Sequence, residues 1–491
     1  MSEGTTERLK TNLIFNIIYQ LVVVLAPLVV TPKISRVFGA DYVGLRSYTY
    51  SIVYYFAIFG TLGLDMYGMR EIARVRDDKD ARSREFFSIW ILKGCFGLVS
   101  TIVYLFSFIL FNGDPFLKII YLLWLIYLIR ECINPAWYLQ GLEKYKFLSV
   151  TNILSQIAYV VVVFLFVNQK SDLPLYILFY TSIPAAITLL TIVFVLFNVK
   201  FQRIKFSDCV KHIKPTFVYF VPTIATALYS MVDKTMLGLF DQSKIMTGYY
   251  EQAEKVVKVA TALTSASFPI MRSRMSYSHE NQDEEKYNSY CEKFISLSMC
   301  LCIPIMFGII GIARDFVPVF FGDGYDEVTP LLYAFSAIVP CLTISGVLQA
   351  IYIFPLGKQG KMNIYYVIVL GSNLILNLCL IPFIGAIGAV IASIASEFLL
   401  AVILLIKSRT RVKIKLFVSK SIKYVLSSVV MGGVILAISF FVSLPLLYKV
   451  MLEILSGIIT YFVVCLILRD NFVWTQFKLV LAKMKICKGQ K

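Results

Sequence analysis

The sequence predicts an all-α integral membrane protein with about fourteen transmembrane helices. Three observations predict this class: the composition, the recurrence of apolar runs about 20 residues long, and the placement of lysine and arginine between those runs. Of the 491 residues, 58% are hydrophobic and only 16% are charged. Such a chain cannot cover a water-soluble surface with polar side chains, so its outer face is expected to contact lipid.

Apolar windows long enough to cross a bilayer recur along the whole chain. The predicted spans are 12–32, 41–64, 87–111, 117–139, 149–168, 174–197, 216–238, 248–270, 290–312, 329–354, 362–382, 385–406, 421–443 and 447–468. An even number of spans places the two ends of the chain on the same side of the membrane.

Lysine and arginine are concentrated in alternate connections. If the N-terminus is cytoplasmic, the segments on that side hold 32 of these residues, and only seven lie at the opposite ends of the spans. Basic residues favour the cytoplasmic side, so both termini are predicted to be cytoplasmic. This distribution also accounts for the net charge of +17 without a nucleic-acid partner.

Few residues suit catalysis or metal binding. The ten cysteines are scattered, and the two histidines, His212 and His279, are expected in loops. The outer loops are short, which disfavours a membrane-embedded enzyme with catalytic residues in a large outer domain. The sequence therefore predicts neither an enzyme nor a bound cofactor.

Three pairs of segments predict an internal repeat. The stretch 117–146 and residues 349–361 each close an apolar run with an aromatic-rich end, a glycine and two lysines. Residues 62–70 fall at a position like that of residues 266–272, and residues 189–205 resemble residues 399–415. The predicted lobes contain six spans each, and two further spans and a basic cytoplasmic tail follow. Their limits are 1–206 for the N-terminal lobe, 207–415 for the C-terminal lobe and 416–491 for the remainder. Parallel repeats of this kind, arranged around a central cavity, are typical of transporters.

Ionisable residues inside the predicted spans are the main candidates for a binding site. A charge at the centre of a span costs about 2.5 to 3.5 kcal/mol, so something must compensate it. The first-lobe candidates for substrate binding are Arg46, Tyr50, Tyr54, Lys93, Arg130 and Asn134. Helical spacing places Asn134 on the face of Arg130, whereas Glu131 is expected to point elsewhere. The excess of cations favours an anionic group such as a phosphate or pyrophosphate.

The remaining candidates are more mixed in charge. Lys258 is near the middle of its span and is a further substrate-binding candidate, while Asp233, Glu251 and Glu397 are candidates for binding a coupling ion. Glu251 and Lys255, like Glu254 and Lys258, are four residues apart, so ion pairing is the structural alternative. Tyrosine rings could offer flat faces to sugars, although aromatic residues also gather at membrane interfaces.

Four segments carry a family resemblance. These are PKISRVFG at 32–39, GMREIA at 68–73, WYLQGLEK at 137–144 and DKTMLG at 233–238. The chain resembles the bacterial oligosaccharide flippases of the polysaccharide biosynthesis family, within the multidrug/oligosaccharidyl-lipid/polysaccharide exporter superfamily. Members have two six-span lobes and two extra helices, as expected above.

The resemblance implies a substrate and a location. The family moves undecaprenyl-pyrophosphate-linked oligosaccharides to the outer leaflet of the bacterial cytoplasmic membrane, for O-antigen, capsule or exopolysaccharide assembly. It also implies alternating access coupled to H⁺ or Na⁺, and a pathway shared with a polymerase and chain-length proteins. A multidrug cation antiporter, a lipid II-type flippase and a non-transporting membrane scaffold are the alternatives.

Overall fold

The computed structural model describes residues 3–412 and 414–478, with side chains described from residue 22 onward except at 24, 221, 222, 225, 226 and 414. This part of the chain is almost entirely helical and contains no β-strand. The chain divides into two compact units, Met1–Gly248 and Tyr249–Lys491. The predicted lobe limits at 206 and 415 stay predictions, and most of the predicted basic tail, residues 479–491, lies outside the described residues.

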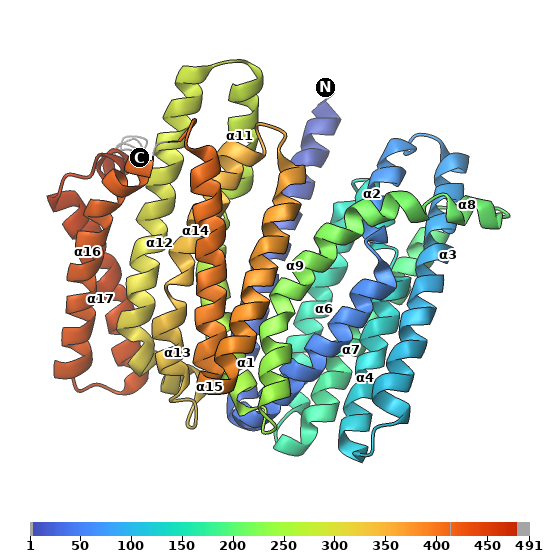
Figure 1. Cartoon of the computed structure of the whole chain (residues 1–491), viewed down its shortest axis with the longest axis horizontal. Helices are drawn as coiled ribbons and strands as arrows, with labels where there is room; N and C mark the ends of the chain where they lie inside the picture. Colours follow the sequence, from blue (N-terminus) through green and yellow to red (C-terminus); the bar gives the residue numbers. More distant parts are fainter. Residues whose placement is uncertain (1–2, 413, 479–491) are drawn as a thin grey trace, which may run out of the picture. The chain divides into compact units, whose positions relative to one another are not determined.

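The first unit is a bundle of long helices joined by short turns (Figure 1). Its elements are α1 (Glu3–Thr61), α2 (Leu64–Arg74), α3 (Lys79–Tyr104), the π-helix Leu105–Leu110, α4 (Pro115–Ile133), α5 (Ala136–Gly141), α6 (Tyr145–Phe166), the 3₁₀ turn Lys170–Asp172, α7 (Leu173–Leu196), α8 (Phe206–Val210) and α9 (Ile213–Phe240). Helix α1 contains the first two predicted spans, which turn at Gly39. The φ of 70° there is a conformation that glycine adopts at little cost.

The core of the first unit surrounds Trp124 of α4. Its indole is fully buried, and its Nε1 donates a hydrogen bond of 2.9 Å to Thr49 Oγ1 of α1. Buried residues of α1, α4, α6 and α7 pack around it. This packing fixes α4 against the second half of α1, which positions the polar side chains that these helices carry.

The fourth predicted span is broken where α4 meets α5. Pro135 disfavours a helical conformation at the preceding residue, and Asn134 accordingly has an extended backbone with a ψ of 118°. The Asn134 Oδ1 atom accepts the backbone N–H of Ala136 at 3.0 Å and so begins α5. Helix α5 packs on α2, where a Cβ atom on Gly68 would lie 2.6 Å from the Trp137 ring.

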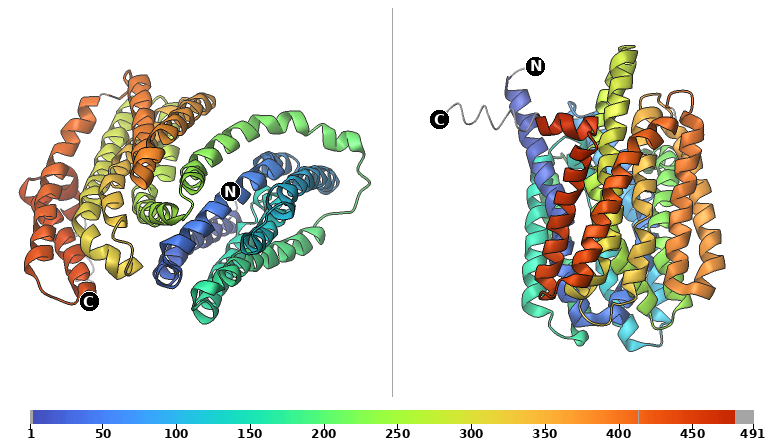
Figure 2. Two further views of the ribbon diagram at one scale, coloured as in Figure 1. Left: turned by 60° about the horizontal axis from the view of Figure 1, so that its bottom comes forward. Right: turned by 90° about the vertical axis from the view of Figure 1, so that its left-hand side faces the viewer.

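The second unit is also a helical bundle (Figure 1). Its elements are α10 (Ile245–Ser265), which starts in the first unit, α11 (Phe268–Glu280), α12 (Glu284–Phe321), α13 (Val328–Phe335), α14 (Ile338–Leu348), the π-helix Gln349–Ile353, α15 (Gln359–Ser408), α16 (Ile414–Phe441) and α17 (Leu446–Ile467). The last two predicted spans are α16 and α17, which lie side by side (Figure 2). Both pack against α12.

The segments that predict the repeat contact each other in both units. In the first unit, Gly68 of α2 lies against Trp137 of α5. In the second unit, the guanidinium carbon of Arg272 on α11 lies 3.5 Å from the centre of the Phe354 ring, just after the π-helix. Each unit therefore packs a short helix against the end of a broken span at the corresponding place.

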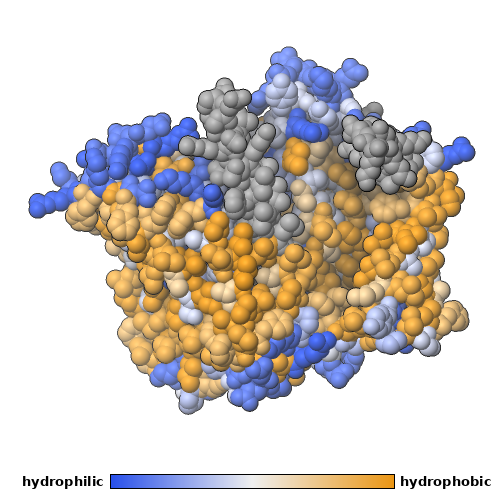
Figure 3. Space-filling view, turned by 180° about the vertical axis from the view of Figure 1, so that it is seen from behind, coloured by the Kyte–Doolittle hydropathy of each residue, from blue (hydrophilic) through white to orange (hydrophobic). Residues whose placement is uncertain are grey.

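The outer surface suits a lipid environment. Within the described residues, nine helical stretches are long and apolar enough to cross a membrane. Of these, Gln359–Ser408 contains two predicted spans, and Leu25–Arg74 contains the second predicted span and the end of the first. The other three predicted spans lie on α4, α9 and α10, each of which carries charged residues. On the face shown in Figure 3, a broad band of hydrophobic residues lies between hydrophilic residues at the top and bottom of the view. The protein is a multi-span membrane protein.

Candidate functional site

Four predicted site residues come together inside the first unit. Helix α1 carries Arg46, Tyr50 and Tyr54 at intervals of four residues, and α4 contributes Arg130. Three further tyrosines, which the sequence alone did not single out, complete the group. The arginine–tyrosine cluster is Arg46, Tyr50, Tyr54, Tyr127, Arg130, Tyr176 and Tyr180.

Arg46 is surrounded by tyrosine rings. Its guanidinium carbon lies 4.8 Å from the centre of the Tyr180 ring, 5.6 Å from that of Tyr50 and 5.9 Å from that of Tyr176. At these distances the negative face of an aromatic ring attracts a cation. The rings therefore hold a positive charge in a largely apolar interior, where an isolated ion would be costly.

Arg130, near the end of α4, also has its guanidinium beside a tyrosine ring. Its guanidinium carbon lies 5.2 Å from the centre of the Tyr127 ring, and the Tyr50 hydroxyl donates to the Tyr127 hydroxyl at 3.4 Å. The Tyr50 and Tyr180 rings meet edge to face with centroids 6.2 Å apart. A continuous row of rings thus joins Arg46 to Arg130.

Two details around Arg130 differ from the sequence prediction. Its guanidinium forms an ion pair with Glu131, although the sequence predicts that Glu131 points elsewhere. Both side chains are long enough to curl together in the last turn of α4. The prediction that Asn134 lies on the same helix face as Arg130 is also wrong. Helix α4 ends at Ile133, and helical spacing does not continue past the break.

The cluster offers both donors and flat apolar faces. The Nε atom of Arg130 is buried and has no hydrogen-bond partner among the described residues. A guanidinium carries five N–H donors in a planar fork that matches carboxylate and phosphate oxygens. Two guanidinium groups with stacked rings between them can accommodate an anion and a sugar.

Lys93, another predicted substrate-binding residue, lies outside the arginine–tyrosine cluster. The fully buried Lys93 ammonium lies 2.5 Å from Asp65 Oδ1 and donates to the Asn134 carbonyl oxygen at 3.0 Å. Asn134 thus contributes its backbone oxygen to Lys93 and its side chain to the start of α5. Both residues hold the α4–α5 break in place, while their predicted contact with substrate stays a prediction.

The other predicted residues do not form one group. On α10, Lys258 pairs with Glu254 at 2.8 Å and Lys255 with Glu251 at 3.4 Å, in agreement with their four-residue spacing. Asp233 on α9 and Glu397 on α15 are both buried. Their role in ion coupling stays a prediction. Among the described residues, no group of three or more histidines, cysteines or acids is placed to hold a metal ion.

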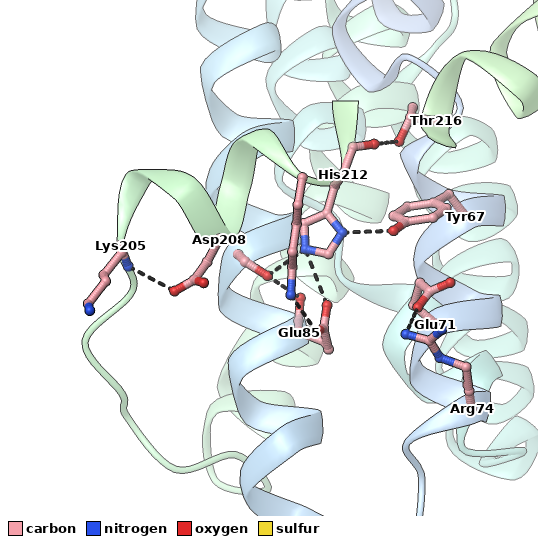
Figure 4. A network of polar contacts seen from close by, with 10 residues as sticks. Tyr67, Glu71, Arg74, Glu85, Lys205, Asp208, His212 and Thr216 are labelled. Carbon is pink, nitrogen blue, oxygen red and sulfur yellow. Dashed lines mark hydrogen bonds and ion pairs between the residues drawn. The ribbon is translucent and has the colours of Figure 1, made fainter. Parts of the chain in front are cut away.

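Sequence reasoning missed a buried histidine network in the first unit (Figure 4). His212 lies in the turn before α9, as predicted, but its ring is buried. Its Nδ1 atom lies 2.8 Å from the Tyr67 hydroxyl, and its Nε2 atom lies 2.9 Å from Ser88 Oγ and 3.2 Å from Glu85 Oε2. A histidine in a basic loop looks solvated from sequence, so no local signal marks it.

Hydrogen bonding around His212 indicates its tautomer. Ser88 Oγ donates to the Glu85 backbone carbonyl oxygen at 3.1 Å, so its lone pairs can accept the N–H of Nε2. The Tyr67 hydroxyl can then donate to Nδ1. Burial lowers the pKa of His212 to about 4 and raises the pKa of Tyr67 to about 12, so both are neutral at pH 7. The neutral ring joins α2 and α3 to the start of α9.

The helical fold of this multi-span protein is similar to that of solved membrane proteins. The structure of the lipid II flippase MurJ, in an inward closed conformation, gives a TM-score of 0.73 at 18% identity and covers 93% of this chain and 99% of its own. An inward-facing multidrug resistance transporter of the MATE family, in the MOP superfamily, gives 0.58 at 13% identity, with coverage of 80% and 94%. These similarities confirm the predicted all-α fold.

Residues 9–275 match the model of the family described as polysaccharide biosynthesis protein, and the chain belongs to this family. A putative O-antigen transporter of Escherichia coli K12 is 26% identical over 351 residues, which are 69% of this chain and 82% of that protein. A probable low-salt glycan biosynthesis flippase of Haloferax volcanii is 25% identical over 254 residues, which are 50% of this chain and 52% of that protein. The predicted family is confirmed, and these relatives are named as transporters or flippases.

Proposed function

We propose that this protein is a flippase for lipid-linked oligosaccharides. Its substrate is an undecaprenyl-pyrophosphate-linked repeat unit, which it moves from the cytoplasmic to the outer leaflet for assembly of a surface polysaccharide. The family and the names of the relatives support this class of activity. The observation that carries the substrate assignment is the row of tyrosine rings that joins Arg46 to Arg130.

The cluster matches the two parts of such a head group. A pyrophosphate carries negative charge, and guanidinium groups bind phosphate oxygens through paired, charge-assisted hydrogen bonds. The sugars are uncharged rings, which can pack on the faces of Tyr50 and Tyr180. A carrier for organic cations would instead need acidic residues in this place, so the two arginines disfavour a multidrug cation antiporter.

The predicted topology places the two arginines at different depths. Arg46 lies seven residues after the turn at Gly39, and Arg130 lies three residues before the end of α4. In the orientation predicted from the basic loops, Arg46 is nearer the outer surface and Arg130 nearer the cytoplasm. A pyrophosphate could therefore meet Arg130 first and Arg46 later, with tyrosine rings between them.

The remaining assignments complete the proposal. The protein lies in the bacterial cytoplasmic membrane with both termini in the cytoplasm. Lys258 contributes to substrate binding, H⁺ or Na⁺ coupling uses Asp233, Glu251 or Glu397, and the polyprenyl tail stays in lipid. A polymerase and chain-length proteins act on the product.

Deletion of the gene in its native host tests the proposal. We expect loss of the surface polysaccharide and accumulation of its undecaprenyl-linked repeat units on the cytoplasmic side, both reversed when the gene is restored. Accumulated lipid II would instead assign the protein to cell-wall synthesis. Normal polymer with altered tolerance to cationic drugs would overturn the proposal.

A further inference from the structure

Helices α12, α16 and α17 enclose a polar cluster that lies outside the arginine–tyrosine cluster. Asp315 is near the end of α12, Ser439 is near the end of α16, and Lys449 and Glu453 lie in the first turns of α17. These positions are at the same end of the three helices, close to the turn between α16 and α17. We call this group the Asp315–Glu453 cluster.

The Asp315 carboxylate in this cluster has both a hydrogen-bond donor and a cation as partners. Its Oδ2 atom accepts a hydrogen bond of 2.5 Å from Ser439 Oγ and lies 3.0 Å from Lys449 Nζ. The Asp315 and Lys449 side chains are only 10% and 12% exposed, so they form a largely buried ion pair. One positive and one negative charge therefore already compensate each other.

A negative charge on Glu453 would have no such compensation. Its side chain is fully buried, and neither carboxyl oxygen has a hydrogen-bond partner among the described residues. The polar group beside it is the Asp315 carboxylate, which is an acceptor. A second buried negative charge at this place would be unpaired, and two carboxylates that share a site do not both remain ionised.

We propose that the Asp315–Glu453 cluster is a proton-binding site, in which Glu453 carries the proton and donates its O–H to the Asp315 carboxylate. The proton changes the cluster from a net charge of −1 to neutrality and supplies the missing donor. On release, the proton passes to water and leaves two carboxylates facing one lysine. The titratable groups facing Glu453 are Asp315 of α12 and Lys449 of α17, and α16 contributes the Ser439 hydroxyl.

This inference goes beyond the proposed function, because the site is defined without reference to the cargo. It concerns α16 and α17, the two helices that the sequence places outside the repeat. Protonation holds α17 to α12 through a carboxyl–carboxylate hydrogen bond, and loss of the proton replaces that bond with repulsion. The site thereby makes the attachment of the two extra helices depend on proton binding.

Infrared difference spectroscopy of the full-length protein in lipid nanodiscs tests the proposal. At pH 7, the wild type should show a carbonyl stretch of a protonated carboxylic acid that is lost in Glu453→Gln. The matched control is Glu292→Gln on α12, the helix that carries Asp315, where the Glu292 side chain is 58% exposed and pairs with Lys420 at 3.5 Å. This control should keep the band. Identical wild-type and Glu453→Gln spectra in this region would overturn the proposal.

Two further measurements separate the alternatives. Replacing choline chloride with sodium chloride should leave the band unchanged, whereas its loss in sodium alone would identify a metal-cation site and overturn the proton assignment. Glu453→Gln should keep the wild-type melting temperature at pH 7, because an amide can also donate to Asp315. Unfolding of this variant would mean that the ionised carboxylate is required, and would also overturn the proposal.

Discussion

Lys93 and Asp65 form an ion pair of 2.5 Å that holds the break in the fourth span against α2. The Lys93 side chain is 1% exposed and that of Asp65 is 45% exposed, so water reaches only the acid. The same ammonium donates to the Asn134 carbonyl oxygen, which α4 leaves without a helical partner. One lysine therefore connects α2, α3 and the end of α4.

Replacing Lys93 with Met should destabilise the first unit. The variant leaves the Asn134 carbonyl oxygen buried without a donor and Asp65 without its partner, at a cost of about 1 to 3 kcal/mol. Because Asp65 is partly solvated, the loss of stability should be smaller than for a fully buried ion pair. The melting temperature of purified protein should fall clearly.

Lys200→Met is the control for this variant. Lys200 pairs with Asp80 at 2.7 Å, but both side chains are more than half exposed. Loss of this exposed ion pair should lower the free energy of unfolding by less than about 1 kcal/mol. Equal melting temperatures for the two variants would contradict the structural role assigned to Lys93.

Replacing Arg130 with Ala should reduce transport without unfolding the protein. Hydrogen bonds to charged groups contribute about 1.5 to 3 kcal/mol, so the rate at limiting substrate should fall roughly 10- to 100-fold. Arg130→Lys should retain part of the activity, because it keeps the charge but not the planar fork. Repeat-unit translocation into proteoliposomes measures both variants.

Lys118→Ala supplies the matched control on the same helix. Lys118 is exposed near the start of α4 and should be dispensable. If Arg130→Ala transports as well as Lys118→Ala, the arginine–tyrosine cluster is not the anion site.

The sequence predicted the fold better than it predicted the contacts of the site. Crossing a bilayer requires about 20 apolar residues, so the spans are visible in one dimension. The spacing of Arg46, Tyr50 and Tyr54 also predicts their common face. Tyr127, Tyr176 and Tyr180 join them only through tertiary packing, which no local pattern encodes.

Three failures have identifiable causes. Helical spacing placed Asn134 with Arg130, but the residue before Pro135 leaves the helix. His212 looked solvated because its burial depends on α2 and α3, which are distant in sequence. Glu453 could have been found, because it is an acid inside the predicted span 447–468 and meets the criterion that singled out Arg130.

Gly68 should not tolerate a larger residue. A Cβ atom at this position would lie 2.6 Å from Trp137 Cε3, and Trp137 is buried and packed against Phe86, with ring centroids 5.6 Å apart. Gly68→Ala should therefore cost about 1 to 3 kcal/mol through overpacking between α2 and α5.

Gly94→Ala on α3 separates this effect from helix propensity. A Cβ atom on Gly94 would meet no heavy atom within 4 Å, so alanine should be neutral or slightly stabilising there. Thermal unfolding of the two variants measures the difference. A stabilised Gly68→Ala protein would contradict the close α2–α5 packing.

The His212 network should make the stability of the first unit sensitive to acid. Burial lowers the pKa of His212 from 6.5 to about 4, and Asp208 and Glu85 only partly oppose this, while Lys211 and Arg74 reinforce it. Between these two values the unfolded chain binds more protons than the folded chain, so stability rises with pH. The contribution is complete above pH 6.5 and is lost as the pH falls toward 4.

The size of this effect follows from the difference between the two pKa values. It corresponds to roughly 3.5 kcal/mol, because the two pKa values differ by about 2.5 and one pKa unit equals about 1.4 kcal/mol. His212→Gln removes the titrating group but retains polar atoms for Tyr67 and Ser88. Its melting temperature should be lower than that of the wild type at pH 7.5 and should fall less steeply between pH 7 and pH 4.5.

His279→Gln controls for the other histidine, which lies in the last turn of α11 and is partly exposed. This variant should follow the wild-type pH dependence, because it leaves the buried His212 network unchanged. The comparison isolates His212 from the carboxylates that titrate in the same range, since both variants retain them all. If His212→Gln and the wild type lose stability in parallel on acidification, the buried ring is not the acid-sensitive connection between α2, α3 and α9.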